Sequence, residues 1–220
     1  MYFFVRRVFS FFLRLGSKVT VEGAENIPAT GGFLLTTNHL SQIDPPLLLL
    51  AVPRRIRVFA AEKYRRNPFF RLLFDVMGCV WVRQFEADHE ALREAIHHLK
   101  EGGILGMSPE GTRSRKTHAL MRARGGAALI ASRAGTPILP MAVWGTENFV
   151  RDLLHLRRAH ISVRIGKPYR LDISPHAKGA DLEKGTDEIM YAIAALLPPA
   201  YRGEYADSPR LSSGSYEAGA

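Results

Sequence analysis

Hydrophobic and polar positions along the chain follow two repeats, one typical of buried strands and one typical of amphipathic helices. Apolar runs predict buried strands at residues 32–36, 104–107, 138–143 and 161–165, and shorter runs predict strands at 18–21, 57–60 and 80–82. Apolar residues at helical spacing predict helices at 44–51, 69–77, 88–100, 125–134 and 181–197. Strands that alternate with helices in this way predict an α/β fold with a mixed, largely parallel sheet and helices on both faces.

The first residues predict a further, amphipathic helix. Its apolar positions recur at helical spacing and its polar positions share another face; they are Phe4, Val8, Phe11 and Leu15, and Arg7, Ser10 and Arg14. Aromatic side chains beside arginines are typical of a helix in a membrane interface, although the same periodicity also fits a first helix packed on the core. We expect this helix at 1–16, the main domain at 17–202 and a disordered tail, rich in Ser, Gly and Ala, at 203–220.

Composition and charge narrow the choice of partners. The chain has 220 residues and a net charge of +9, which favours anionic partners such as lipid headgroups, phosphorylated substrates or an acidic carrier protein. We expect no nucleic-acid partner, because no nucleic-acid-binding motif is present and the basic residues are dispersed. The single cysteine, Cys79, excludes an internal disulfide and a cysteine-built zinc site. No charge-free run approaches the roughly 20 apolar residues of a transmembrane helix, so we expect no transmembrane span.

A first polar cluster follows the predicted strand at 32–36, where α/β sheets commonly bind ligands. It contains Asn38, His39 and Asp44, and its residues alone leave two interpretations open. Asp44 before Pro45 is typical of a helix N-cap, with the proline at the first helical position. Alternatively, His39 is a general base whose second ring nitrogen is hydrogen-bonded to Asp44, and the group that it activates is a substrate hydroxyl.

A second polar cluster, residues 108–115, follows the predicted strand at 104–107. Gly111 permits close backbone approach, Thr112 and Ser114 offer hydroxyls, and Arg113 is suited to bidentate phosphate binding. Glu110 would orient Arg113 or accept a hydrogen bond from a sugar or glycerol hydroxyl. The alternative is a polar loop with an exposed arginine.

The two clusters in this order resemble the glycerolipid acyltransferase family, most of all its bacterial 1-acyl-sn-glycerol-3-phosphate acyltransferase type. The matching motifs are N-H-x-x-x-x-D at 38–44 and P-E-G-T-R-S at 109–114. The surroundings at 21–28, 67–78 and 138–146 resemble the family as well, so the resemblance runs from about residue 19 to residue 168.

This resemblance implies direct acyl transfer with no metal, cofactor or acyl-enzyme. His39, oriented by Asp44, would take the proton from the sn-2 hydroxyl of lysophosphatidic acid, which attacks the thioester of acyl-CoA or acyl-carrier protein. Glu110, Gly111, Thr112 and Arg113, with Ser114, would hold the glycerol phosphate. The expected product is phosphatidic acid for phospholipid biosynthesis, and the expected location is an anionic membrane surface on the cytoplasmic face of the cell membrane, in peripheral or monotopic contact.

Two rival functions stay open. The first is an acyltransferase of the same fold with another acceptor, such as a different lysolipid, glycerol 3-phosphate or an aminoacyl lipid. The second is a non-catalytic basic module that binds membranes.

One position departs from the family pattern. Family members often place an arginine six residues after the glycine of the second block, where this chain has Gln84, and Arg83 comes one residue earlier. A shift of one residue turns a strand side chain to the other face. A phosphate contact from Arg83 therefore requires a bulge that re-aims it, and the alternative is an outward-facing arginine.

Overall fold

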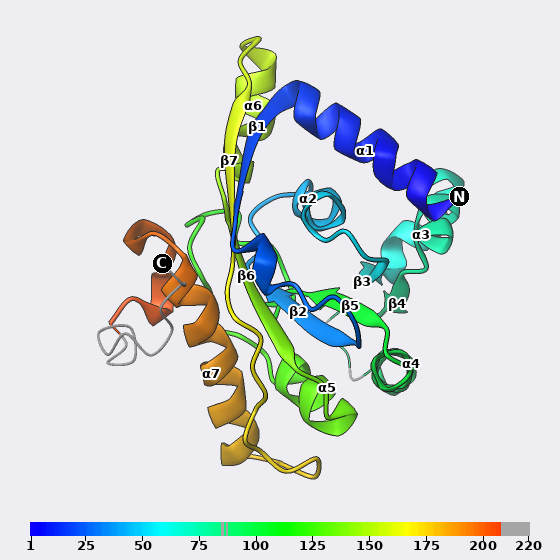
Figure 1. Cartoon of the computed structure of the whole chain (residues 1–220), viewed down its shortest axis with the longest axis vertical. Coiled ribbons are helices and arrows are strands. Elements are labelled where there is room, and N and C mark those ends of the chain that lie inside the picture. The colour runs from blue at the N-terminus through cyan, green and yellow to red at the C-terminus, as the bar shows by residue number, and fades with distance from the viewer. Residues whose placement is uncertain (85, 87, 208–220) are drawn as a thin grey trace.

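The structure, a computed structural model, describes residues 1–84, 86 and 88–207. Its centre is a seven-stranded sheet with the strand order β1-β7-β6-β2-β5-β3-β4 (Figure 1). The strands are β1 Ser17–Glu22, β2 Phe33–Thr37, β3 Ile56–Ala61, β4 Val80–Val82, β5 Ile104–Met107, β6 Ile138–Trp144 and β7 Ala159–Ile165. Every neighbouring pair is parallel except β6 with β7. The prediction of a mixed, largely parallel sheet is confirmed.

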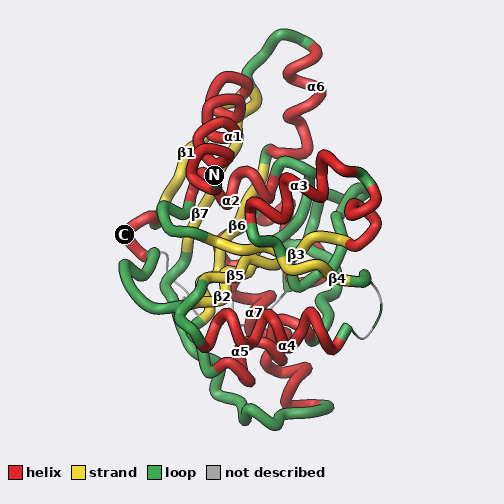
Figure 2. Tube along the Cα trace, turned by 90° about the vertical axis from the view of Figure 1, so that its right-hand side faces the viewer, coloured by secondary structure: helices red, strands yellow, loops and turns green. Residues whose placement is uncertain are grey.

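Helices cover both faces of this sheet, as Figure 2 shows. They are α1 Tyr2–Gly16, α2 Asp44–Ala51, α3 Pro68–Met77, α4 His89–Lys100, α5 Gly126–Ala134, α6 Phe149–Leu154 and α7 Ala180–Leu196. Adjacent residues of β2 explain the two layers, because successive strand side chains point to opposite faces. Leu35 packs into a core shared with α1 and α2, while Leu34 packs into a second core shared with α4, α5 and α7.

The central strands end where polar residues begin. β2 pairs with β5 on one side and with β6 on the other, all parallel, and every residue of β2 is buried. The carboxyl ends of β2 and β5 therefore meet at one edge of the sheet, and the two polar clusters follow these two strands. The fold brings the clusters together as expected.

Two parts of the chain differ from the sequence prediction. The disordered tail predicted from residue 203 is wrong for 203–207, because Gly203–Tyr205 forms a short 3-10 helix. The buried Tyr205 hydroxyl accepts a hydrogen bond from the Ala123 backbone N–H at 3.2 Å, and this contact anchors the segment on the main domain. Residues 208–220 lie outside the described part of the chain. The sequence prediction also missed α6, whose six residues are too few to display a periodic pattern.

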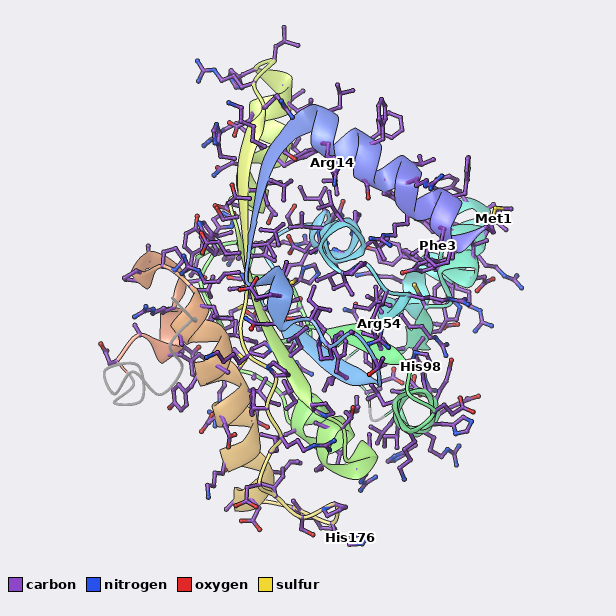
Figure 3. The ribbon with its side chains drawn as sticks, in the orientation of Figure 1. Met1, Phe3, Arg14, Arg54, His98 and His176 are labelled. Atoms are coloured by element: carbon purple, nitrogen blue, oxygen red, sulfur yellow. The ribbon has the colours of Figure 1, made fainter. Side chains whose placement is uncertain are left out.

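The N-terminal helix α1 has one side packed on the core and one apolar side exposed. One side of it packs on the core through Tyr2, Val5, Phe9 and Leu13. The predicted apolar face points outward, and Phe4, Val8, Phe11 and Leu15 are between 38% and 66% exposed. Figure 3 labels Met1 and Arg14 near the two ends of the helix. Within the described residues, no helix has both the length and the apolar character needed to cross a membrane.

Candidate active site

The carboxyl edge of the sheet opens into a cavity of about 450 Å³. Its lining includes polar residues of the two clusters, among them His39, Asp44 and Ser108. It also includes apolar side chains of β3, α4 and α5, among them Val58, Phe59, Leu92, Leu129 and Ile130. A cavity lined by both kinds of side chain suits an amphiphilic ligand.

Asn38 fixes the loop that leaves β2. Its side-chain amide donates to the Val143 carbonyl at 2.7 Å and accepts from the Val143 N–H at 2.8 Å. These two bonds pair a side chain with the backbone of β6, as another strand residue would. Asn38 is buried and is therefore a structural anchor for the residue that follows it.

His39 and Asp44 form a hydrogen-bonded pair within this anchored loop. Nδ1 of His39 lies 2.8 Å from Oδ2 of Asp44. Because an ionised carboxylate can only accept, Nδ1 carries the proton and Nε2 presents its lone pair. The His39 side chain is 25% exposed and lines the cavity, and Nε2 has no hydrogen-bond partner within the described residues. This arrangement is that of a general base held by a carboxylate.

The N-cap predicted at Asp44 is wrong. Ile43 occupies the N-cap position, and Asp44 is the first residue of α2. Its side chain turns back toward the preceding loop, where the same Oδ2 accepts from the N–H groups of Leu40 at 2.7 Å and Ser41 at 2.8 Å. The carboxylate therefore closes the turn between His39 and α2, and this turn brings two residues five positions apart into contact.

Glu110 and Ser114 hold the main chain of His39 from the other side. Oε1 of Glu110 accepts from the His39 N–H at 3.0 Å and Oε2 accepts from the Met121 N–H at 3.0 Å. The Ser114 N–H donates to the His39 carbonyl at 2.9 Å, and the buried Ser114 hydroxyl donates to Ala119. The second cluster thus positions the histidine.

These bonds give Glu110 and Ser114 roles that the sequence did not predict. Each carboxylate oxygen of Glu110 accepts from a backbone N–H group, and the side chain is buried. The Ser114 hydroxyl is likewise used inside the protein. Burial raises the pKa of Glu110 to about 7, against the lowering effect of the two N–H groups.

The remaining residues of the second cluster divide between two cavities. Gly111 lines the His39 cavity and has a φ of 69°, a left-handed conformation that favours glycine. Thr112 and Arg113 line a neighbouring cavity of about 600 Å³ together with Arg115 and Lys116. The structure therefore does not bring the Arg113 side chain to the wall of the His39 cavity, contrary to the sequence prediction.

The motifs in this site match a known family. The family model described as acyltransferase matches residues 18–144, which is more than half of the chain and includes both polar clusters. The chain belongs to the acyltransferase family.

Individual curated proteins are also similar to this chain. A 1-acyl-sn-glycerol-3-phosphate acyltransferase of Borreliella burgdorferi is 32% identical over 136 residues, which cover 61% of this chain and 54% of that protein. An N-acylphosphatidylethanolamine synthase of Arabidopsis thaliana is 31% identical over 170 residues, which cover 68% of this chain and 60% of that protein. The chain thus spans little more than half the length of these curated relatives.

A solved structure is also similar. The crystal structure of a 1-acyl-sn-glycerophosphate acyltransferase of Thermotoga maritima matches with a TM-score of 0.66 and 28% identity. The match covers 84% of this chain and 74% of the other. The α/β layers described above are therefore the fold of a characterised acyltransferase structure.

Sequence reasoning missed one cationic residue of this acyltransferase site. Arg124 lines the His39 cavity, and its side chain lies beside Gly111. It immediately precedes the glycines that open α5, and its N–H donates to the Pro109 carbonyl at 2.9 Å. The sequence could have indicated Arg124, because this residue directly precedes the predicted helix at 125–134. In an α/β sheet such a helix begins at the edge where the preceding strand ends, which is the edge that binds ligands.

Arg83 also lines this cavity. Because β4 ends at Val82, Arg83 follows the strand, and the rule of alternating strand faces does not decide its direction. Its guanidinium Nε lies 3.4 Å from Asp88 and 3.7 Å from Glu86. Gln84 also lines the cavity and donates to the Gly111 carbonyl at 3.4 Å.

Proposed function

We propose that this acyltransferase acylates the sn-2 hydroxyl of 1-acyl-sn-glycerol 3-phosphate, lysophosphatidic acid, with acyl-CoA or acyl-carrier protein as donor. The observation that carries the proposal is Nε2 of His39, which has no hydrogen-bond partner among the described residues and belongs to a side chain that lines a cavity with both polar and apolar walls. The names of the Borreliella and Thermotoga relatives supply the acceptor. Phosphatidic acid would be the lipid product.

The reaction needs one proton to move away from the acceptor and one to reach the leaving group. Nε2 of His39 takes the hydroxyl proton as the oxygen attacks the thioester carbonyl carbon. The C–S bond breaks, the new ester C–O bond remains, and the proton passes from the imidazolium to the departing thiolate. Asp44 stabilises the imidazolium during this step through its bond to Nδ1. Every atom balances without a metal or an acyl-enzyme.

The apolar side chains that line the cavity suit an acyl chain. They include side chains of β3, α4 and α5, with Leu92, Leu129 and Ile130 among them. Arg124 and Arg83 are the cationic residues of the cavity lining. We assign the glycerol phosphate mainly to Arg124, because its side chain lies beside Gly111 of the second cluster, where the backbone permits close approach.

A second acceptor class has a specific observation in its favour. The Arabidopsis relative is named as an N-acylphosphatidylethanolamine synthase, so the acceptor nucleophile of that protein is named as an amine. A general base such as His39 can deprotonate an amine as well as a hydroxyl. The acceptor therefore has to be tested directly.

The deciding experiment measures acyl transfer by the purified protein over a panel of acceptors. The panel holds lysophosphatidic acid, lysophosphatidylcholine, lysophosphatidylethanolamine, phosphatidylethanolamine and glycerol 3-phosphate, each with acyl-CoA and with acyl-carrier protein. We expect the highest kcat/KM with lysophosphatidic acid. Turnover of phosphatidylethanolamine or another lysolipid, with none of lysophosphatidic acid, would contradict the proposal.

A matched pair of arginine variants separates the two cavities. Arg124→Ala is expected to raise the KM for lysophosphatidic acid by about 10- to 100-fold, because charge-assisted hydrogen bonds are worth about 1.5–3 kcal/mol. Arg113→Ala should leave that KM within about threefold and should raise the KM for the donor instead. The measurement is steady-state kinetics with each substrate varied in turn. If the acceptor KM rises in Arg113→Ala and not in Arg124→Ala, the phosphate contact belongs to Arg113 instead.

The donor KM is expected to depend on Arg113 because the cavity around it is lined by positive charges. Arg113, Arg115 and Lys116 line the neighbouring cavity and have no salt bridge within the described residues. Both CoA and the phosphopantetheine arm of a carrier protein carry phosphate. The loop that bears these cations is hydrogen-bonded to the backbone of His39 through Ser114, so a donor held there would have its thioester within reach of the base.

The exposed face of α1 supports a location at a membrane surface. The outward face of α1 combines exposed phenylalanines with arginines, which is the composition of a helix at a membrane interface. We place the enzyme on an anionic membrane surface, at the cytoplasmic face of the cell membrane, with α1 lying in the headgroup region. An acceptor that is itself a membrane lipid supports this location.

A further inference from the structure

The exposed large apolar side chains of the described residues belong to only three segments. α1 provides one group, α3 provides Phe69 and Leu72, and α6 with the turn after it provides Val150, Leu153, Leu154 and Leu156. Single exposed apolar residues are ordinary on a protein surface, but a restriction to three segments marks a contact surface. The layer formed by α4, α5 and α7 contributes none of them.

The third segment, residues 150–157, is called the α6 tip below. Leu154 is 78% exposed and Leu156 is 97% exposed. Leu156 also has a φ of 56°, a left-handed conformation that a leucine rarely adopts. These two leucines are left largely exposed, whereas Phe149 and Leu153 of α6 lie beside Gly16 of α1.

The α6 tip is fixed beside the C-terminal end of α1. The Arg158 guanidinium, directly after the tip, donates to the Ser17 carbonyl at 2.8 Å and to the Arg14 carbonyl. Figure 1 shows α6 beside this end of α1 and α3 beside the other end. The α6 tip and α3 therefore lie near opposite ends of α1, and each contacts it.

The charges around these segments favour an anionic lipid surface over a second copy of the chain. Residues 1–16 contain three arginines and no acidic residue. Residues 149–158 contain three arginines and one aspartate, Asp152, which lies 3.5 Å from Arg151. Two copies that met through this surface would bring like charges together, whereas anionic headgroups would neutralise them.

We propose that the α6 tip is a second membrane-contact element, which inserts Leu154 and Leu156 into an anionic bilayer surface beside α1. Two contacts at a distance from each other fix the orientation of a peripheral protein, which one amphipathic helix alone does not. The inference rests on the proposed function only where it takes the substrate to be a membrane lipid, and its test needs no turnover.

The test compares vesicle binding of three forms of the full chain. The variant Leu154→Ser with Leu156→Ser removes the inserted side chains, and Leu154→Met with Leu156→Met keeps them apolar as a matched control. Co-sedimentation is measured with vesicles of phosphatidylglycerol and phosphatidylcholine, and with phosphatidylcholine alone. We expect the serine variant to lose at least about tenfold in partition coefficient on the anionic vesicles and the methionine variant to retain the wild-type value.

Several outcomes would overturn the inference. Anionic-vesicle binding of the serine variant within twofold of wild type is one, and absence of wild-type binding to those vesicles is another. A wild-type dimer that becomes a monomer in the serine variant, measured by light scattering without lipid, would assign the surface to a second copy instead.

Measuring acyl transfer separates the failure of this inference from the failure of the proposed function. The serine variant should acylate a short-chain, monomeric lysophosphatidic acid at the wild-type rate, because no residue of the α6 tip lines the His39 cavity. A wild-type protein that binds vesicles through the tip but turns over no lysophosphatidic acid would refute the proposed function alone.

Discussion

Replacing His39 with alanine is expected to lower kcat for acyl transfer by about 10²–10⁴-fold, the usual contribution of a positioned general base. Among the residues that the structure describes, the imidazole of His39 lines the cavity with an unpartnered nitrogen, and no second histidine is part of the lining. The acceptor KM should change little, because the proposed phosphate contact lies with Arg124. The measurement is steady-state kinetics with lysophosphatidic acid and the better of the two donors.

The variant should still fold, because the fixed points of the loop are main-chain groups. The N–H of residue 39 keeps Glu110 as its acceptor, and the carbonyl keeps the Ser114 N–H. Thermal unfolding within a few degrees of wild type, and unchanged vesicle binding, are the expected controls. His97→Ala, on the exposed side of α4, is the matched histidine variant and should keep full activity. A His39→Ala enzyme with nearly wild-type kcat would remove His39 as the base.

The sequence predicted the central strands well because β2, β5 and β6 are almost wholly buried. In β2 all five residues are buried, so the strand is a continuous apolar run that periodicity identifies directly. The order of the strands could not be read in the same way. β7 runs antiparallel to β6, and its parallel pairing with β1 joins residues more than a hundred positions apart.

The histidine and aspartate were predictable as a pair, but their supports were not. Asn38 is bonded to Val143, and Glu110 is bonded to His39, across 105 and 71 positions of sequence. A buried glutamate that accepts two backbone N–H groups has the same sequence signature as one that faces a ligand. This is why the chain alone suggested substrate contacts for Glu110 and Ser114.

The motif in the loop between β5 and α5 did not predict which way its side chains point. Its length and composition located a polar site correctly, but an irregular loop has no period that assigns its faces. The left-handed turn at Gly111 and the bond from Ser114 to His39 decide that Arg113 faces one cavity, while Arg124 faces the other. Only the folded chain contains that information.

Replacing Asp44 with asparagine is expected to lower kcat by about 10²–10⁴-fold, approaching the roughly 10⁴-fold loss that the equivalent substitution causes in a serine protease triad. The amide is nearly isosteric with the carboxylate, so its oxygen can occupy the place of Oδ2 and still accept from the N–H groups of Leu40 and Ser41. Its amide nitrogen then takes the place of the buried Oδ1, which has no hydrogen-bond partner in the described part of the chain. The turn should survive, but the negative charge beside His39 is lost.

Loss of that charge acts on the chemical step more than on binding. The imidazolium that forms when Nε2 takes the proton loses its ionised partner 2.8 Å away, in a site where Asp44 is 3% exposed and water screens little. We therefore expect kcat to fall while the KM values for both substrates stay within about threefold, a division that a collapsed cavity would not produce. Asp181→Asn, in the exposed first turn of α7, removes the same charge elsewhere and should leave kcat unchanged. An Asp44→Asn enzyme with wild-type kcat would show that the carboxylate only closes the turn into α2, and that His39 needs no ionised partner.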